Sequence, residues 1–172
     1  VDDTRLAERF ADLESKMPQG ATPHVVGETA VLHNLDVPLA DQLVETVTAN
    51  APAAVEELIV TAPFFDRNGM ALAGLIDRLA PRKVVLYATT ATSVDGAELA
   101  RRLQDSDAEV SLFAYEPDRF THAKLIAVVG RSRAWVLSGS ANLSRAALTL
   151  DASVGNVELA VLSAAIPDDA RA

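Results

Sequence analysis

Apolar residues recur along the chain in two alternating patterns, which predict helices separated by strands. Apolar positions three and four residues apart predict amphipathic helices, and short runs of valine, isoleucine and leucine predict buried strands. Residues 3–17 show the helical pattern first, and Pro18 to Gly20 end it. Strands are expected next at 29–33, 57–61, 83–88 and 109–115, and helices after Pro38, over Leu72 to Leu79, and after the cap Asp95.

The pattern changes after residue 120, where three strands are expected with one short helical stretch. These strands are 122–129, 133–139 and 156–162, and the helical stretch is 144–150. Strand–helix alternation followed by clustered strands predicts an α/β fold with a mixed, mainly parallel sheet flanked by helices on both faces. We expect residues 1–20 to form an N-terminal helix and linker, and residues 21–172 to form one domain.

Composition limits the compartment and the cofactors that we expect. No apolar run reaches the roughly 18 residues of a membrane span, and no secretion signal is recognisable, so we expect a cytoplasmic chain without a membrane span. The absence of cysteine excludes disulfides and thiolate metal sites, and we expect neither a metal nor a cofactor. Because the chain starts at Val1 and not at methionine, we expect it to be a piece of a longer protein or a processed product.

The charge is unevenly distributed along the chain. A net charge of −9 argues against a surface that grips duplex DNA over its whole area. Residues 119–150 nevertheless contain five basic and no acidic residues, so this segment carries +5 and the remainder −14. We interpret the local excess as a site for an anionic substrate, the alternative being an arbitrary fluctuation among surface charges.

Three short motifs in this last third of the chain carry the candidate chemistry. They are His122-x-Lys124, Gly139-Ser140-x-Asn142 and Asn156-x-Glu158. Residues two apart on a strand face the same side, so His122 should project with Lys124, and Asn156 with Glu158. The strand end at Gly139 opens onto a predicted helix, whose first N–H groups are available to an anion. We therefore expect three elements to converge on one phosphate.

Each side chain has a chemical reason to be present. A neutral imidazole at His122 can attack phosphorus or move a proton near neutral pH, and Lys124 supplies positive charge for phosphate oxygens. Ser140 and Asn142 supply oriented donors for charge that develops in the transition state. Glu158 is expected to accept a hydrogen bond from the His122 ring. Each residue also has a structural alternative. His122 could be a buried strand histidine whose hydrogen bonds are satisfied, and Glu158 could be a surface residue on an edge strand. Ser140 and Asn142 could be ordinary turn and cap residues.

Together the three motifs resemble one HKD motif of the phospholipase D superfamily, over residues 120–160, and the upstream stretch Thr61 to Asp66 is also similar to a lobe of that family. The family pattern has an aspartate five positions after the lysine, where this chain has Val129. The resemblance implies a phospholipase D-like domain whose site residues are of two kinds. The catalytic residues would be His122, Lys124 and Glu158, and the substrate-binding residues Gly139, Ser140, Asn142 and Asn156.

The resemblance further implies metal-independent phosphodiester cleavage through a phosphohistidine. A second histidine protonates the leaving group and then activates water, so two HKD motifs make one active site. Neither His24 nor His33 is followed two residues later by lysine, so we expect a second lobe, preferably from a longer protein and otherwise from a homodimer mate. Nucleic acid is the expected substrate. The alternatives are a catalytically silent phosphate- or partner-binding lobe and a phospholipid hydrolase or transphosphatidylase.

Overall fold

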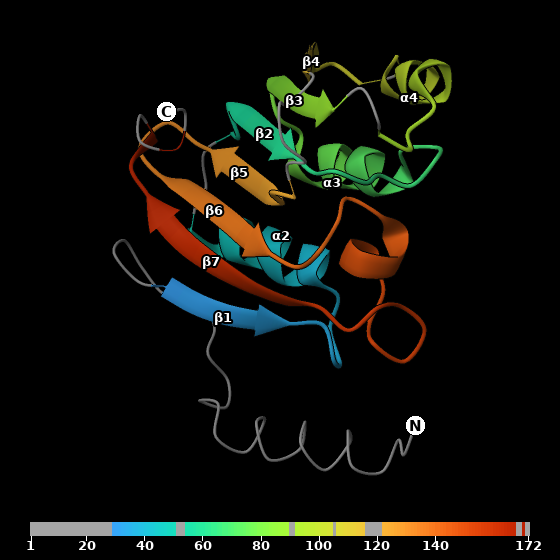
Figure 1. Ribbon diagram of the computed structural model, residues 1–172. Coiled ribbons are helices and arrows are strands. Elements are labelled where there is room, and N and C mark those ends of the chain that lie inside the picture. The colour runs from blue at the N-terminus through green and yellow to red at the C-terminus, as the bar shows by residue number, and fades with distance from the viewer. Residues whose placement is uncertain are drawn as a thin grey trace.

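The chain folds around one seven-stranded sheet (Figure 1). This computed structural model describes residues 29–50, 54–89, 92–104, 106–115, 122–167 and 170, so the predicted helix at 3–17 and the boundary near residue 20 lie outside the described residues. The strands are β1 (Thr29–His33), β2 (Glu57–Thr61), β3 (Lys83–Thr89), β4 (Glu109–Tyr115), β5 (Leu125–Val129), β6 (Ala134–Gly139) and β7 (Leu159–Ala165). The helices are α2 (Leu39–Asn50), α3 (Met70–Leu79), α4 (Gly96–Leu103) and the π-helix η1 (Arg145–Thr149).

The strand order is β1-β7-β6-β5-β2-β3-β4. Only β2–β3 and β3–β4 are parallel, and the other neighbours are antiparallel. The predicted mixed α/β class is confirmed, but the expectation of a mainly parallel sheet is wrong. Helices α3 and α4 carry the chain between parallel neighbours, whereas residues 130–133 join β5 to β6 directly, and a connection that short reverses the strand direction.

The core lies between the sheet and a layer formed by α2, α3 and η1, which pack against one another (Figure 1). The apolar stripes predicted for these helices are buried, as Leu39 and Leu43 of α2 and Leu72 and Leu75 of α3 show. Burial of a leucine side chain contributes about 1.5–3 kcal/mol. Apolar contact therefore fixes the helix layer on this face of the sheet.

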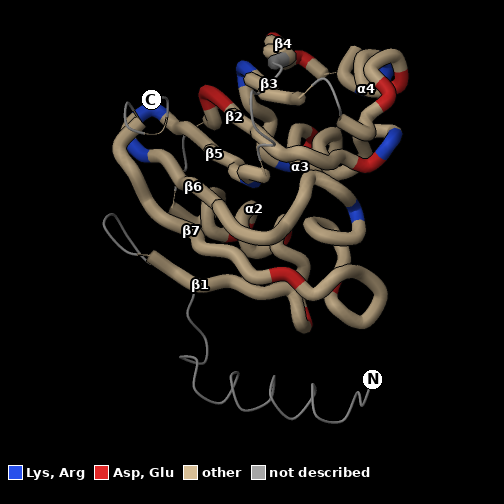
Figure 2. Tube along the Cα trace, viewed as in Figure 1, with Lys and Arg blue, Asp and Glu red and all other residues tan. Residues whose placement is uncertain are grey.

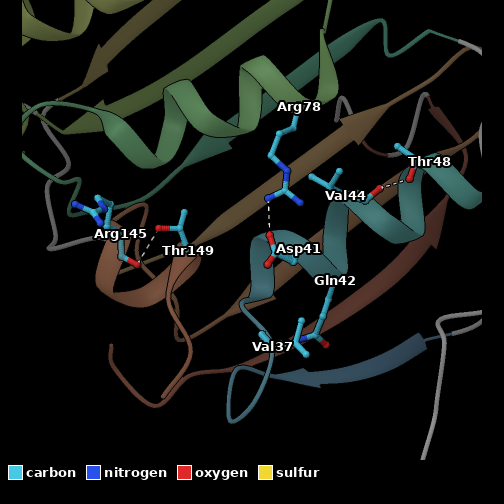
Figure 3. A network of polar contacts seen from close by, with 8 residues as sticks. All are labelled: Val37, Asp41, Gln42, Val44, Thr48, Arg78, Arg145 and Thr149. Atoms are coloured by element: carbon cyan, nitrogen blue, oxygen red, sulfur yellow. Dashed lines mark hydrogen bonds and ion pairs between the residues drawn. The ribbon is translucent and has the colours of Figure 1, made fainter. Parts of the chain in front are cut away.

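Polar contacts at the outer edge of this helix layer contribute less to stability than the apolar contacts of the core. Arg78 of α3 pairs with Asp41 of α2 (Figure 3). The Arg78 Nη1 and Asp41 Oδ1 atoms are 2.6 Å apart, and both side chains are well exposed. Such an exposed pair contributes about 0–1 kcal/mol. Beside it, Arg145 and Thr149 of η1 help to line a hollow of about 280 Å³ between the helices. This hollow is separate from the predicted motifs.

The opposite face of the sheet carries exposed apolar side chains at β1 and β7. Val31 lies opposite Val161 in the antiparallel ladder, and the two side chains are 49% and 37% exposed. The alternate residues Leu32 and Leu162 are buried in the core. The packed helix layer therefore lies on one face, and helix cover of the other face stays a prediction.

Helix α4 begins at the cap that the sequence predicts. The Asp95 carboxylate accepts hydrogen bonds from the N–H groups of Ala97 at 3.0 Å and Glu98 at 3.1 Å. Such a cap contributes typically about 1 kcal/mol. Within the described ranges, no helix has both the length and the apolar run needed to cross a membrane.

Candidate active site

The three predicted motifs lie at one rim of the sheet. In the antiparallel run β5-β6-β7, the start of β5, the end of β6 and the start of β7 share an edge, with Leu125 opposite Ser138 and Gly139 opposite Ala160 (Figure 1). The strands predicted from 122 and 156 begin later, at Leu125 and Leu159, because the pairing with neighbouring strands starts there. The motif residues therefore extend beyond the ladder into the rim.

His122 and Lys124 project together, as predicted. The Lys124 Nζ atom lies 2.8 Å from Nδ1 and 3.0 Å from Nε2 of the His122 ring, and it also donates to the His122 carbonyl oxygen at 3.2 Å. The imidazole is exposed, whereas Lys124 is buried. The Lys124 side chain is therefore held directly against the ring that carries the candidate nucleophile.

Burial lowers the pKa of Lys124 below its ordinary value. The negative charge of Glu158 acts in the opposite direction and partly offsets this effect, so the two side chains interact electrostatically. A buried ammonium near a carboxylate keeps its charge more readily than an isolated one. The site thus holds the Lys124 amine in a buried position beside the Glu158 carboxylate, and its contact with phosphate oxygens stays a prediction.

The buried carboxylate of Glu158 has the hydrogen-bond donors that its burial requires. Ser140 Oγ donates to Oε2, and Asn156 Nδ2 donates to Oε1 at 3.1 Å. The same serine hydroxyl accepts a hydrogen bond from the N–H of Leu159 at 3.0 Å. Three predicted site residues are therefore joined into one network, while the predicted hydrogen bond from the His122 ring to Glu158 stays a prediction.

The helix terminus expected to bind an anion is smaller than predicted. The helical stretch expected at 144–150 is the five-residue π-helix η1, and an element of one turn has little dipole. The N–H of Leu143 donates to Phe64 at 3.2 Å, and that of Ser144 donates to Asn142 at 2.8 Å. The N–H groups of these two residues before η1 are thus occupied, and anion binding by the first N–H groups of η1 itself stays a prediction. The Asn142 Oδ1 atom is buried and has no hydrogen-bond partner among the described residues.

Gly139 has a steric reason to be glycine. A Cβ atom at this position would meet the carbonyl oxygen of Leu159 and would lie 2.6 Å from the Cα atom of Ala160. Real Cβ atoms essentially never approach so closely. Gly139 therefore permits the close approach of β6 and β7 that brings Ser140 to Glu158. Direct contact of Gly139 with substrate stays a prediction.

Two further residues at the rim were not among the predicted site residues. The exposed ring of Phe64 lies edge-on to His122, with 6.4 Å between the ring centroids. Asn34 is fully buried and hydrogen bonded to the main chain of Asn156 and Glu158. Phe64 belongs to the Thr61 to Asp66 stretch noted in the sequence. For Asn34, the one indication in the sequence is that a polar residue directly follows the predicted strand 29–33.

The basic residues of the +5 segment do not all gather at the motifs (Figure 2). Lys124 lies at the site, but Arg131 and Arg133 are in the connection between β5 and β6, at the opposite end of these strands. Arg145 starts η1 and lines the hollow between the helices. The interpretation of the charge excess as one anion-binding patch is therefore wrong for Arg131 and Arg133, and it stays a prediction for Arg145.

Val129 marks the position where the family pattern has an aspartate. It is fully buried at the far end of β5, opposite Ala134 of β6. Five residues of extended strand separate it from Lys124, which corresponds to about 17 Å. A valine at this position fits the apolar surroundings, and its side chain lies outside the network of the rim.

The comparisons with known proteins show the fold. No protein-family model matches the chain, and no curated protein matches its sequence. The structure is similar to NucT from Helicobacter pylori, with a TM-score of 0.53 and 14% identity over 84% of this chain and 89% of that one. Nuc from Salmonella typhimurium, a phospholipase D family member, aligns with a TM-score of 0.49 and 21% identity over 84% of this chain and 88% of its own.

A longer protein also matches. Yeast tyrosyl-DNA phosphodiesterase aligns over 78% of this chain with a TM-score of 0.48 and 12% identity. This chain covers 31% of the yeast protein's length, so it corresponds to about a third of that enzyme.

Fold and rim together define a mixed α/β domain that gathers a histidine, a lysine, a serine and a carboxylate at one edge of its sheet. The chain shares its fold with NucT from Helicobacter pylori, so the resemblance carried by its motifs is supported at the level of the fold alone.

Proposed function

We propose that this chain is one lobe of a phospholipase D-like phosphodiesterase that cleaves its substrate without a metal. The observation that carries the proposal is the direct contact of Lys124 with the His122 ring, at the rim where Glu158 and Ser140 also meet. A nucleophile, a cation and a fixed hydroxyl group are the parts that attack on a phosphodiester requires. The fold alone does not carry this function.

The proposed reaction has two steps at His122. A ring nitrogen attacks phosphorus, an N–P bond forms, and the P–O bond to the leaving group breaks as a histidine of a second lobe protonates that oxygen. The second histidine then takes a proton from water, whose oxygen attacks phosphorus and releases His122. Lys124 balances the charge on the phosphate oxygens, and Glu158 fixes the Ser140 hydroxyl. Asn142, Asn156 and Gly139 complete the substrate side of the rim.

The second histidine comes from another lobe. His33 ends β1, and its Nδ1 atom accepts a hydrogen bond from the N–H of Leu35 at 3.4 Å. Such a local contact to the main chain two residues later is typical of a residue in a turn. We propose that a further part of a longer protein, or a second copy of the chain, supplies the missing group. Light scattering tests the second copy directly, since a dimer doubles the mass of 18.2 kDa.

We propose a nucleic-acid phosphodiester as the substrate. Phe64 supports this choice, because its exposed ring beside His122 offers an apolar surface next to the reacting phosphate, on which a base can stack. The same surface suits an aromatic phosphodiester such as bis(p-nitrophenyl) phosphate as a first probe. Single-stranded DNA and phospholipid vesicles with added alcohol then separate a nuclease from a transphosphatidylase.

The test compares wild type with His122→Ala and the control His33→Ala on the nitrophenyl diester, in the presence of a chelator. We expect His122→Ala to abolish hydrolysis, His33→Ala to retain it, and an acid-labile phosphate adduct on His122 to appear by mass spectrometry after rapid quenching. Equal rates for wild type and His122→Ala, with a second lobe confirmed, would contradict the proposal. That result would favour a silent phosphate-binding lobe, which the buried Val129 in place of the family's aspartate also suits.

A further inference from the structure

Asn34 follows β1 and is far in sequence from the three motifs, yet its side chain is bonded to one of them. Its Oδ1 atom accepts a hydrogen bond from the N–H of Glu158 at 2.8 Å, and its Nδ2 group donates to the carbonyl oxygen of Asn156 at 2.7 Å. Nδ2 also donates to the carbonyl oxygen of Leu150 at 3.1 Å. Both donors of the amide and its acceptor are therefore used, as a fully buried amide requires.

The bonded main chain lies just before the ladder of β7, where the Asn34 N–H also donates to the carbonyl oxygen of Glu158 at 3.4 Å and the Asn156 N–H donates to that of Ala146 at 2.7 Å. Residues 156–158 precede β7, whose ladder begins with His33 opposite Leu159. The amide of Asn34 brackets this segment, since it binds the residue on each side of the exposed Val157. The side chains of Asn156 and Glu158 leave the same two positions and meet each other at 3.1 Å. Asn34 thus fixes the backbone from which the carboxylate of the site projects.

We propose that Asn34 is a positioning residue of the active site, whose buried amide holds the main chain of Asn156 and Glu158 and so sets where the Glu158 carboxylate meets Ser140 and Lys124. This inference rests on the proposed function only for its catalytic consequence. The contact itself is a property of the fold. Among the described residues, Asn34 is the one whose side chain bonds both Asn156 and Glu158 through their main chain.

A matched control lies in the same part of the fold. Gln42 of α2, drawn beside Val37 in Figure 3, donates through Nε2 to the carbonyl oxygen of Val37 at 2.8 Å. Nε2 also donates to the carbonyl oxygen of His33 at 2.7 Å. It therefore holds the connection between β1 and α2, next to Asn34, from the helix side. Gln42→Ala removes two hydrogen bonds there and leaves the bonds to Asn156 and Glu158 in place. A loss of stability alone should affect both variants alike.

The experiment measures hydrolysis of bis(p-nitrophenyl) phosphate by Asn34→Ala and Gln42→Ala, each assayed as the dimer or as the longer protein that contains the second lobe. Rates are corrected for the folded fraction determined by circular dichroism. We expect Asn34→Ala to lower kcat about 10- to 100-fold, because small misplacements of catalytic groups are costly, and Gln42→Ala to change it by less than about 2-fold. When Glu158 is already replaced by glutamine, adding Asn34→Ala should lower kcat by less than about 2-fold. Equal losses for both variants, or a full loss in the Glu158→Gln background, would overturn the inference.

Two further readouts separate positioning from stability. Within the described part of the chain, the titratable groups that lie against Lys124 are His122 and Glu158. A displaced Glu158 carboxylate supports the Lys124 ammonium less. The alkaline limb of the pH–rate profile should therefore move to lower pH in Asn34→Ala and stay in place in Gln42→Ala. Exchange of the Glu158 amide proton, followed by NMR, should accelerate at least about 10-fold in Asn34→Ala only, since its acceptor is lost.

The exchange measurement does not depend on activity. If wild type with its second lobe present hydrolyses no phosphodiester but the Glu158 amide exchanges faster in Asn34→Ala only, the proposed function fails and the positioning contact stands. If wild type is active and the exchange rates of both variants match wild type, the positioning role of Asn34 fails and the function stands.

Discussion

Replacing Ser140 with alanine tests the network of the rim most directly. The hydroxyl group donates to the Glu158 carboxylate and accepts from the N–H of Leu159 at 3.0 Å. Because the carboxylate is only 6% exposed, water does not replace the lost donor freely. A hydrogen bond to a charged group contributes about 1.5–3 kcal/mol. For a chain of this length that loss lowers Tm by roughly 3 to 12 °C.

Urea unfolding of Ser140→Ala and of the control Ser138→Ala measures this loss. Ser138 is exposed two residues earlier on β6, and its hydroxyl makes neither of the two bonds, so we expect a change within about 0.5 kcal/mol. A double-mutant cycle of Ser140→Ala with Glu158→Gln should give a coupling energy above about 1 kcal/mol. Additive effects, or equal stability of Ser140→Ala and Ser138→Ala, would refute the assignment of this bond.

Three further predictions follow from the rim and its surroundings. Because burial lowers the pKa of Lys124, the alkaline limb of the pH profile of kcat should lie at lower pH than an exposed lysine would give. Glu158→Gln removes the opposing negative charge and should move this limb to still lower pH. An unchanged limb in Glu158→Gln would contradict the interaction of Lys124 with Glu158. Gly139→Ala should cost about 1–3 kcal/mol in urea unfolding, because its Cβ meets the backbone of β7, whereas Gly74→Ala in α3, with open space around it, should stabilise by about 0.5–1 kcal/mol. Arg131→Gln should change kcat/KM for a short diester by less than about 2-fold, because Arg131 lies beyond the end of β5 that is far from the site. A larger loss would mean that the substrate extends across the sheet to Arg131.

Local patterns predicted most elements but not their pairing. The stripe of Leu72 and Leu75 and the β-rich run at 83–88 gave α3 and β3 at the correct positions, because side-chain periodicity reports which face of an element is buried. Alternation of strands and helices suggested parallel neighbours, and it was correct for β2-β3-β4. The antiparallel partners of β1 and β5 depend on contacts between distant segments, about which periodicity carries no information.

The sequence by itself determined the chemical groups of the candidate site and the spacing within each motif. His122 and Lys124 project together because residues two apart in an extended chain share a side, which needs no knowledge of the fold. Only the tertiary structure decided which groups meet across motifs. Antiparallel pairing of β5, β6 and β7 brings Ser140 to Glu158, and the fully buried Asn34 reaches Glu158 across 124 positions of sequence. The same pairing places Arg131 and Arg133 at the opposite end of the strands from Lys124, because a chain that reverses direction separates in space what lies close in sequence.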